Sequence, residues 1–521
     1  TLAHVGNGNR DRSAVTPGLL IVAIVAVVVG VVLRFVAMSP MWLDEAISAS
    51  LAGVVTGDST GGWSALVEAL RHDGHPPLYY MLLALWSVPF GESDGALRAF
   101  SGVLGVVSLP LVWLVARRYL DQRGCVLVVA VLASSPFAIR YATEARMYAL
   151  LLVLLLVLHL AVARVWERPS VLRSAVLAGV VAALLLTHYW SLFAIAVLGT
   201  GGLVAGVRNG RREVRQAGHL IGAVVAGSLA FLPWLPVLLY QLAHTGTPWS
   251  AAPRPTVVAA LTLEAYGGGR GSEALLVVVT LAVLVAVGLG SRAGSDRPVL
   301  GWTDLGWLRV AVVLGVGTMT LGASVSLATD TAFQGRYGVF ALVSMVLACA
   351  VGLHRMTSRA SVSALAILVL FSGTSVVREL SRDRTQIGEI ADVVRAEGSD
   401  GDVVVFCPDQ MAPAGHRLLA DRFTTLAHPA LDDGRRVDWV DYAERNGAVA
   451  VEAVADAVVA QAAGVDNVWL AWMDGYETFD GQCPQLRVAL ADRLGRPSKA
   501  VYADADAFDD AANLSRFPGG S

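Results

Sequence analysis

Long apolar runs recur along the first three quarters of the chain, and they predict a membrane protein. Several of them reach the roughly 20 residues that an α-helix needs to cross a bilayer. The runs that we expect to cross are 18–38, 97–116, 124–139, 146–163, 172–187, 191–207, 218–238, 274–291, 308–328, 337–353 and 361–377. The first run is not followed by a small-residue cleavage site, so we interpret it as a membrane helix and not as a signal peptide. The predicted fold class is a polytopic α-helical membrane protein with about eleven spans.

The pattern changes after the last apolar run. Residues 402–406 and 465–472 are typical of buried strands, and helical patterns around 411–421 and 448–463 fall between and beside them. We therefore expect two domains: a membrane domain over 1–377, which includes a long first loop over 39–96, and a small α/β domain over 378–521. The last dozen residues are expected to fray.

Arginine is concentrated in alternate connections between the predicted spans. These arginines are Arg10, Arg12, Arg117, Arg118, Arg123, Arg164, Arg168, Arg173, Arg208, Arg211, Arg212, Arg215, Arg292, Arg297, Arg309, Arg355 and Arg359. The positive-inside rule assigns such connections to the cytoplasm. The amino terminus is then cytoplasmic, and an odd number of spans puts 378–521 outside. We expect a multi-pass protein of the cytoplasmic (inner) membrane.

The same orientation gathers the polar clusters on the outer face. These clusters are the loop 39–96 and the segments 141–146, 188–190, 241–273 and 330–336. The apolar run 76–90 has only about 15 residues, which is short for a span. We interpret it as an amphipathic helix at the outer interface, anchored by Tyr79, Tyr80 and Trp86, with 62–71 as a second such helix.

Composition supports the membrane assignment and narrows the partners. The chain has 521 residues, of which 55% are hydrophobic and only 16% charged. A net charge of −3 offers no basic surface for nucleic acid, so we expect no nucleic-acid partner. Of the four cysteines, Cys125 and Cys349 lie in apolar runs and are interpreted as packing residues. Cys407 and Cys483 either form a disulfide, if their domain is extracytoplasmic, or stay as separate thiols.

Three motifs on the predicted outer face carry polar chemistry. The first is the pair Asp44-Glu45, directly after the first span, where carboxylates are costly unless solvated or used. The second is the run His72-Asp73-Gly74-His75-Pro76-Pro77-Leu78-Tyr79-Tyr80. The third is the run Tyr141-Ala142-Thr143-Glu144-Ala145-Arg146-Met147-Tyr148.

These motifs, in this order and on one face, resemble those of the GT-C glycosyltransferases over roughly residues 18–350. The resemblance is to the bacterial branch related to protein O-mannosyltransferases and lipid A aminoarabinose transferases, which is similar to glycosyltransferase family 39. It implies a polyprenyl-phosphate sugar donor and transfer to an acceptor hydroxyl at the outer side of the membrane. It also implies no cofactor and no required metal. The 378–521 domain has no motif of this kind.

The resemblance gives Asp44 the role of catalytic base. An acceptor hydroxyl is a weak nucleophile and needs a base, and attack opposite a phosphate leaving group would invert the anomeric centre. Glu45 would hold the acceptor, tune Asp44 or bind a metal. The alternative for Asp44 is an N-cap of the following helix, and the two roles are compatible.

The leaving phosphate needs cations, and Arg336 is the first candidate, because a guanidinium can bind phosphate in a bidentate manner. Its alternative is an interfacial arginine that reaches toward the headgroups. Arg140 and Arg146 flank the acidic loop, where one would bind phosphate while the other pairs with Glu144. The remaining residues considered for substrate binding are His72, Asp73, His75, Tyr79, Tyr80, Tyr141, Glu144, His188 and Tyr189. A His/Asp/His metal site, interface anchoring by the tyrosines and simple burial of His188 and Tyr189 stay open as alternatives.

The sequence thus favours a glycosyltransferase that works in cell-envelope glycan or lipoglycan synthesis. We favour mannose as the sugar, with arabinose as a second possibility, and a glycan, lipoglycan or protein as the acceptor. The competing class is a membrane transporter or lipid flippase, which would place charges near the bilayer midplane. Here the predicted spans are nearly free of charge and the polar groups gather at one face, which favours interfacial chemistry. A non-catalytic scaffold is the third reading, and it leaves Asp44-Glu45 unexplained.

Overall fold

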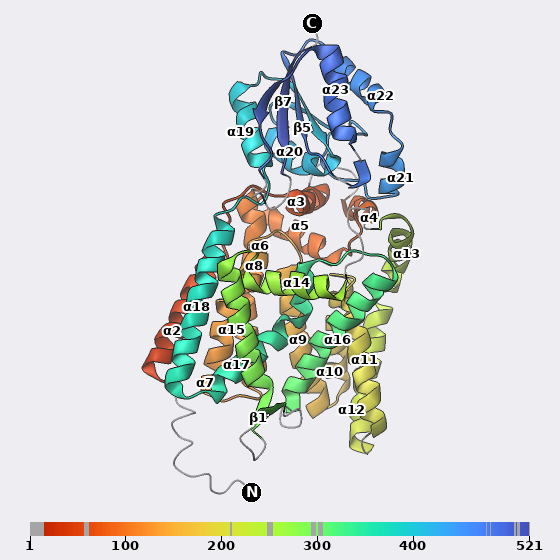
Figure 1. Ribbon diagram of the computed structural model, residues 1–521. Helices are drawn as coiled ribbons and strands as arrows, with labels where there is room; N and C mark the ends of the chain where they lie inside the picture. The colour runs from red at the N-terminus through yellow and green to blue at the C-terminus, as the bar shows by residue number, and fades with distance from the viewer. Residues whose placement is uncertain are drawn as a thin grey trace. The chain divides into compact units, whose positions relative to one another are not determined.

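The computed structural model describes residues 15–56, 62–208, 211–246, 254–292, 298–300, 306–475, 477–479, 481–504, 507 and 511–519 (Figure 1). Arg10, Arg12 and Arg297, which enter the topology argument, and residues 247–253 of the segment 241–273 lie outside these ranges. The chain divides into two compact units. The helical unit comprises Thr1–Val36, Arg98–Pro236 and Ala252–Glu379. The mixed unit comprises Ala37–Leu97, Val237–Ala251 and Leu380–Ser521. The segment 39–96 therefore groups with the C-terminal region in the mixed unit.

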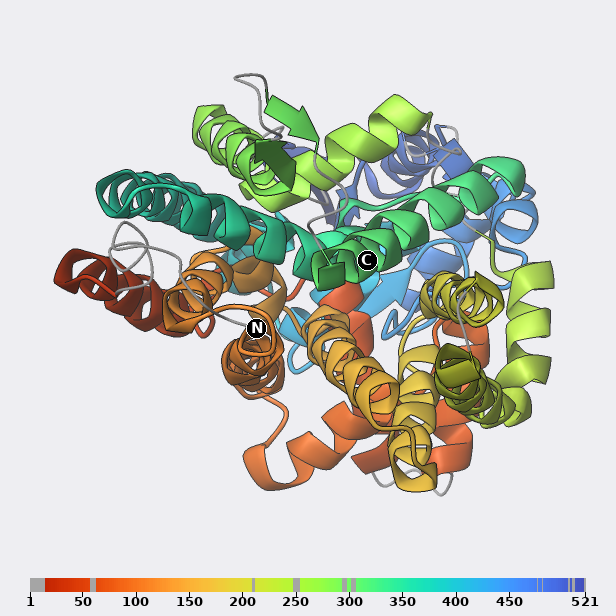
Figure 2. The same cartoon turned by 90° about the horizontal axis from the view of Figure 1, so that it is seen from below.

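The helical unit consists almost entirely of apolar helices. Its elements are α2 (Pro17–Leu33), α6 (Asp94–Ala116), α7 (Gln122–Ala133), α8 (Pro136–Ala142), α9 (Tyr148–Glu167), α10 (Val171–Leu185), α11 (Ser191–Arg208), α12 (Arg211–Leu229), η1 (Leu232–Trp234), α14 (Pro255–Gly267), α15 (Ser272–Leu289), β1 (Gly290–Arg292), β2 (Pro298–Leu300), α16 (Gly306–Ala328), η2 (Gly335–Gly338), α17 (Val339–Arg355) and α18 (Ser358–Leu380). Helix α17 packs against α7, α9, α15 and α16 (Figure 2). It is the most deeply buried of the long apolar helices.

The predicted polytopic helical fold is confirmed. Within the described ranges, seven helices are long and apolar enough to cross a membrane, or eight if the bent pair α7 and α8 counts as one span. The same ranges hold four shorter apolar helices: Pro17–Leu33, Leu78–Phe90, Val171–Leu185 and Ser191–Val207. The bounds differ from the prediction in two regions. The predicted span 218–238 falls within one longer candidate span, Glu213–His244, in which α12 ends at Leu229 and the short η1 precedes the next helix.

The predicted span 124–139 is also broken, between α7 and α8, where the axis bends by 55°. Ser135 caps α8 by accepting a hydrogen bond from the amide of Ala138, and Pro136 occupies the first turn, where its missing N–H costs nothing. The carbonyl groups at the C-terminal end of α7 receive hydrogen bonds from Arg34. Its guanidinium donates to the carbonyls of Ala133 (2.9 Å) and Leu132 (3.0 Å). The bend is therefore specified by caps on both sides, and it brings the 141–148 motif to the start of α9.

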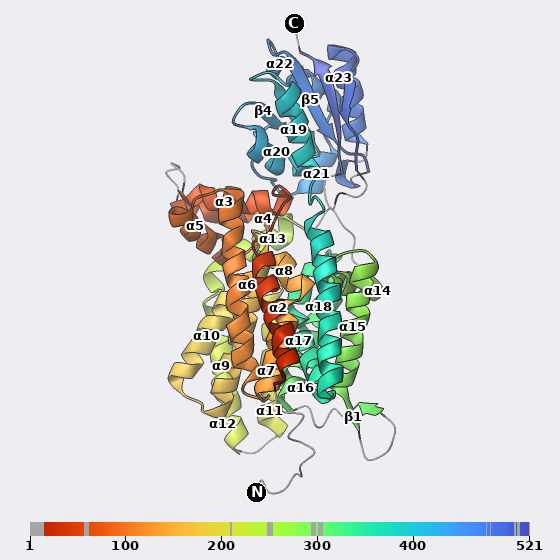
Figure 3. The ribbon, with the colours of Figure 1, turned by 90° about the vertical axis from the view of Figure 1, so that its left-hand side faces the viewer.

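The mixed unit combines helices from two connecting segments with an α/β domain. Its elements are α3 (Leu43–Thr56), α4 (Gly62–Asp73), α5 (Leu78–Phe90), α13 (Leu235–His244), α19 (Ile387–Glu397), β3 (Val403–Cys407), η3 (Asp409–Met411), α20 (Ala412–Leu419), β4 (Thr424–Ala427), α21 (Tyr442–Gly447), α22 (Val451–Gln461), β5 (Asn467–Trp472), η4 (Glu477–Phe479), α23 (Gln482–Leu494), β6 (Ser498–Val501) and β7 (Asn513–Pro518). Helix α3 packs against α4, α5 and α20 (Figure 3).

The five-stranded sheet has the order β4-β3-β5-β7-β6. Strand β3 pairs in parallel with β4 and β5, whereas β7 pairs antiparallel with β5 and β6. The two predicted strands are therefore β3 and β5, neighbours in the centre of the sheet. The predicted fraying of the last dozen residues is wrong for Asn513–Pro518, because β7 is an interior strand bonded on both sides.

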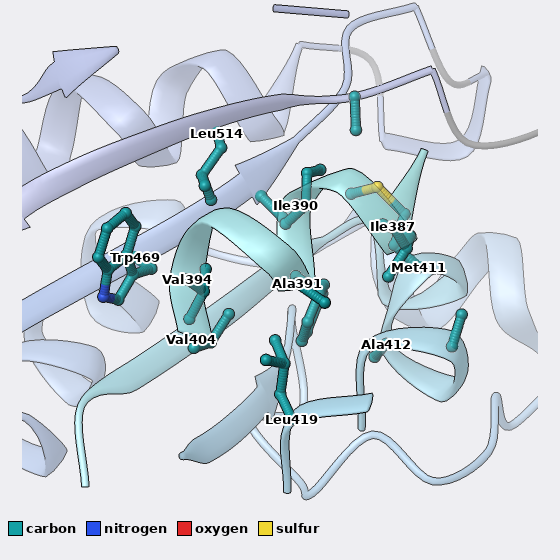
Figure 4. Packing of buried hydrophobic residues seen from close by; sticks show 14 of the residues in the cluster. Ile387, Ile390, Ala391, Val394, Val404, Met411, Ala412, Leu419, Trp469 and Leu514 are labelled. Carbon is teal, nitrogen blue, oxygen red and sulfur yellow. The ribbon is translucent and has the colours of Figure 1, made fainter. Parts of the chain in front are cut away.

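One apolar core holds this domain together (Figure 4). Ile387, Ile390 and Val394 of α19 bury one face against β3 and α20, with Trp469 of β5 fully enclosed. Burying side chains of this size contributes roughly 1.5–3 kcal/mol each. At the end of β3, Cys407 is joined to Cys483 at the start of α23 by a disulfide, with Cα atoms 5.4 Å apart. Cys125 and Cys349 are buried thiols.

Candidate active site

Asp44 and Glu45 lie in the first turn of α3, in the mixed unit. The helix begins at Leu43, and the carbonyl of Trp42 accepts hydrogen bonds from the amides of Glu45 and Ala46, both 3.0 Å. Asp44 is therefore inside the helix and is not its N-cap, so the capping alternative does not describe it. The N-terminal end of a helix still favours a negative charge. Asp44 keeps part of its surface exposed, whereas Glu45 is completely buried.

Glu45 has an arginine neighbour that the sequence analysis missed. A terminal guanidinium nitrogen of Arg384 lies 3.5 Å from Oε2 of Glu45, and both side chains are buried, at 4% and 0% exposure. Arg384 follows α18, and its backbone amide donates to Oγ of Ser39 (2.8 Å). Nothing in the local sequence distinguishes Arg384 from Arg378 or Arg382, so only the fold reveals this pairing.

The residues His72, Asp73 and His75 do not form one cluster, because the two histidines contact different carboxylates. His75 Nδ1 lies 2.8 Å from Oδ2 of Asp73, while His72 Nδ1 lies 2.8 Å from Oδ1 of Asp438. The two histidines thus face different carboxylates and do not share one. In the part of the chain that the structure describes, no three His, Cys, Asp or Glu side chains gather as a metal site requires.

Tyr79 and Tyr80 are completely buried. Their rings pack edge to face, 5.7 Å apart, and the Tyr80 hydroxyl lies 3.5 Å from Oδ2 of Asp73. Because neither ring reaches the surface, the predicted anchoring of α5 by these tyrosines in the membrane interface is wrong. The exposed apolar side chains of this helix are instead Leu85, Val88 and Phe90.

In the helical unit, Arg140 is bound by two carboxylates. Its Nε lies 2.8 Å from Oε1 of Glu144, and a terminal nitrogen lies 2.5 Å from Oε1 of Glu379 at the end of α18. All three side chains are mostly buried. Arg140 is thus one arginine that pairs with Glu144. Two carboxylates therefore compete with a phosphate for the Arg140 guanidinium.

Arg146 lies in the short turn between α8 and α9 and is buried. Its amide donates to the carbonyl of Glu144 (2.8 Å), and its own carbonyl accepts from Oγ of Ser101 (3.3 Å). These bonds fix the backbone of the 141–148 motif. Both bonds involve backbone atoms of Arg146, so they do not determine where its guanidinium points.

Arg336 lies in η2, beside a group of aromatic rings. Its guanidinium carbon is 5.9 Å from the ring centroid of Tyr148, close enough for a cation–π contact. Tyr148 in turn packs on Tyr141 at 5.0 Å and on His188 at 5.9 Å. Tyr337 lies between His188 (5.3 Å) and Trp190 (4.6 Å). Arg336 therefore extends over an aromatic surface built from α8, α9, η2 and the start of α11.

His188 and Tyr189 have separate partners. Nδ1 of His188 accepts a hydrogen bond from the amide of Trp190 (3.1 Å), so that nitrogen carries no proton when the ring makes this bond. The hydroxyl of Tyr189 accepts from Nε1 of Trp234 (2.9 Å). His188 is buried among the rings, while Tyr189 is half-buried.

The sequence-predicted site residues therefore fall into two groups. Asp44, Glu45, His72, Asp73 and His75 belong to the mixed unit, with Arg384 added by the structure. Arg140, Glu144, Arg146, Arg336, Tyr141, His188 and Tyr189 belong to the helical unit. The first group offers carboxylates and the second offers a cationic and aromatic surface.

Comparisons with known proteins find similarity at the level of a family model and of the fold. The family model described as dolichyl-phosphate-mannose-protein mannosyltransferase matches residues 74–240. The crystal structure of ArnT from Cupriavidus metallidurans in the apo state is similar with a TM-score of 0.61, at 13% identity, over 96% of this chain and 97% of that one. The structure of ArnT from the same organism bound to undecaprenyl phosphate has a TM-score of 0.59, at 13% identity, over 96% and 98%. No curated protein sequence matches the chain.

The chain has the fold of ArnT and, within the described residues, seven helices long and apolar enough to cross a membrane. The match to that family model over residues 74–240 and the fold shared with ArnT agree with the GT-C resemblance that the motifs carry.

Proposed function

We propose that this glycosyltransferase takes a sugar from a polyprenyl-phosphate carrier and transfers it to an acceptor hydroxyl on the outer face of the cytoplasmic membrane. The ArnT structure of the same fold binds undecaprenyl phosphate. The matching family model is described by a dolichyl-phosphate-mannose donor, which is also a polyprenyl-type phosphate sugar. Both support a lipid-phosphate donor. The description of the family model favours mannose as the sugar, with arabinose as the second possibility.

The single observation that carries the proposal is the carboxylate pair at the start of α3. Asp44 is partly exposed and lies beside the buried Glu45, so one carboxylate can meet an acceptor while its neighbour is held in place. In the reaction, Asp44 takes the proton of the acceptor hydroxyl as its oxygen attacks the anomeric carbon. The bond from that carbon to the phosphate oxygen breaks, and the polyprenyl phosphate leaves with the electron pair. Attack from the side opposite the phosphate inverts the anomeric centre.

Arg336 supplies the positive charge that the leaving phosphate needs. Its guanidinium lies over the ring of Tyr148, whereas Arg140 faces two carboxylates. A guanidinium that binds the developing phosphate charge lowers the barrier to bond cleavage. The aromatic rings around it provide an apolar surface of the kind that the first prenyl units require.

An outer-face reaction agrees with two independent features. Arginine-rich connections alternate with the polar clusters, which the positive-inside rule assigns to opposite sides. The disulfide between Cys407 and Cys483 belongs to an oxidising compartment, which the cytoplasm is not. The acceptor is then a cell-envelope glycan, a lipoglycan or a protein.

The proposal is tested with purified full-length protein, a short-chain polyprenyl-phosphate mannose labelled in the sugar, and the envelope fraction of a deletion strain as acceptor. We expect label to move to the acceptor fraction. A parallel reaction with polyprenyl-phosphate arabinose identifies the sugar. Absence of transfer from both donors, together with an unchanged envelope glycan profile in the deletion strain, would contradict the proposal.

A further inference from the structure

Arg384 and Glu45 form an ion pair that is removed from water on both sides, with exposures of 4% and 0% and a nitrogen–oxygen distance of 3.5 Å. Burying two charges costs several kcal/mol each, and their attraction in the interior often does no more than offset that cost. An apolar pair of similar volume would serve stability equally well. The pair therefore points to a task besides stability, and its carboxylate is the neighbour of the proposed base Asp44.

The backbone around Arg384 is fixed against the segment that leads into α3. The amide of Arg384 donates to Oγ of Ser39 (2.8 Å). Four residues later, a Cβ on Gly388 would lie 2.7 Å from the ring of Pro40, so the two segments approach more closely than any side chain at position 388 would allow. The arginine thus comes from a segment docked directly on the start of the catalytic helix.

This docked segment belongs to the region that follows the last long apolar helix. It continues into α19, whose buried face is part of the core of the α/β domain. The position of the guanidinium relative to Glu45 is therefore determined by the fold of that domain.

We propose that Arg384 is a positioning residue for transfer: it orients Glu45, and through it the Asp44-Glu45 pair, so that the C-terminal region completes the catalytic carboxylate site. The inference rests on the proposed function of Asp44. It assigns to residues 380–521 a part in the chemical step. The removal of Arg384 should accordingly affect turnover and not donor binding.

The test compares Arg384→Ala and Arg384→Lys with the control Arg417→Ala in the labelled mannose assay. Arg417 also pairs with a carboxylate of the first loop, Asp94 (2.7 Å), but this pair is partly exposed, at 27% and 35%, and lies at the other end of that loop. Partners that orient the ligands of a metal typically contribute 10–100-fold, and we expect the same range for a residue that orients a carboxylate. We expect Arg384→Ala to lose kcat by that factor, with donor KM changed less than about twofold. Arg384→Lys should recover part of the loss, since it keeps the charge.

The control separates positioning from stability. Arg417→Ala should lower the unfolding temperature in detergent while keeping its kcat. Added guanidinium should restore part of the turnover of Arg384→Ala. A wild-type kcat in folded Arg384→Ala, or an equal loss of kcat in Arg417→Ala, would overturn the inference.

Glu45→Gln provides a second test that holds even when Arg384→Ala folds poorly. If Arg384 acts through Glu45, then Arg384→Lys should lower kcat in the wild-type background and have little further effect in the Glu45→Gln background. An equal loss of kcat in both backgrounds would overturn the inference. The activities of wild type and Asp44→Asn report separately on the proposed function, because they involve no change at position 384.

Discussion

His72 and Asp438 are bonded to each other across 366 positions of sequence, with Nδ1 and Oδ1 2.8 Å apart. The same turn of the α/β domain is held at its other end, where Nδ1 of His244 lies 3.0 Å from Oδ1 of Asp441. Two backbone hydrogen bonds accompany these pairs. The amide of Trp439 donates to the carbonyl of His72 (3.1 Å), and the amide of Asp441 donates to the carbonyl of His244 (2.7 Å). Asp441 has a φ of 48°, a conformation unusual for a non-glycine residue. The ends of α4 and α13 thus clamp one turn of the C-terminal domain, so these segments should fold together.

Asp44→Asn should abolish transfer while leaving folding intact. The amide keeps the size of the side chain but cannot take a proton, and positioned bases contribute roughly 10²–10⁴-fold. The measurement is labelled sugar transfer by purified protein, with equal unfolding temperatures as the check on folding. Asp492→Asn, at an exposed position on α23, is the control and should be fully active. Retention of more than about a tenth of the activity would remove Asp44 as the base.

Arg336→Ala should weaken donor use by about tenfold or more, because a hydrogen bond to a charged group contributes about 1.5–3 kcal/mol. Arg336→Lys should recover part of this, since a point charge replaces a planar fork. Steady-state kinetics with varied donor at saturating acceptor measure the effect. Unchanged donor kinetics in Arg336→Ala would move the phosphate site to another arginine.

Arg140→Ala should act differently. It would leave Glu144 and Glu379, with side-chain exposures of 2% and 11%, without their shared cation. Removing one partner of a buried ion pair costs about 3–5 kcal/mol. We expect a lower unfolding temperature in detergent, and a normal donor KM for the fraction that remains folded. A raised donor KM at unchanged stability would instead return Arg140 to the phosphate site.

Asp409 should make the stability of the C-terminal domain depend on pH. Burial raises the pKa of this carboxyl to about 7, against the lowering effect of the hydrogen bond from the Tyr442 hydroxyl. Since the folded pKa lies above the ordinary value of 3.8, the contribution of Asp409 to stability is largest below pH 3.8 and is lost as pH rises to about 7. Asp409→Asn keeps an oxygen for Tyr442 and cannot ionise. Above pH 7 it should therefore be more stable than wild type, measured by tryptophan fluorescence during thermal unfolding.

A second buried group, His428, also makes the stability of this domain depend on pH, in both wild type and Asp409→Asn. Burial lowers the pKa of His428 to about 4, so this histidine opposes Asp409 by favouring the folded state as pH rises from about 4 to 6.5. Both proteins contain His428, and its contribution cancels in their difference. A difference in stability that does not change between pH 5 and pH 8 would contradict the assignment for Asp409.

Several features of the fold follow directly from the sequence, because they depend on local pattern. Hydropathy predicts the long helices, and the runs of β-branched and aromatic residues predict β3 and β5. Strand β7 could not be predicted in this way, since Asn513–Pro518 is short and partly polar. It is a strand because it pairs with β5 and β6. The role of Arg384 could not be predicted for a similar reason, because an ion pair between segments distant in sequence produces no periodic pattern.

The disulfide should stabilise the α/β domain by restricting its unfolded chain. The two cysteines are 76 positions apart, and the chain-entropy relation gives about 4.5 kcal/mol for a loop of this length. Replacing Cys407 and Cys483 by alanine, or adding reductant to wild type, should lower the unfolding temperature. Reductant should have no further effect on the double variant. An unfolding temperature that is unchanged by either treatment would contradict this prediction.

The orientation in the membrane underlies the assignment of every outer residue, and reporter fusions test it directly. Alkaline phosphatase fused after Arg384 should be active, since the positive-inside rule places this position outside and the enzyme folds only in an oxidising compartment. A fusion after Arg215, in α12, should be inactive and serves as the control. Thiol labelling of intact cells should modify Cys407 and Cys483 only after reduction. An inactive fusion at Arg384 with an active one at Arg215 would reverse the faces. Asp44 would then meet the cytoplasm, where nucleotide sugars are present, and the argument for a lipid-linked donor would lose its physical reason.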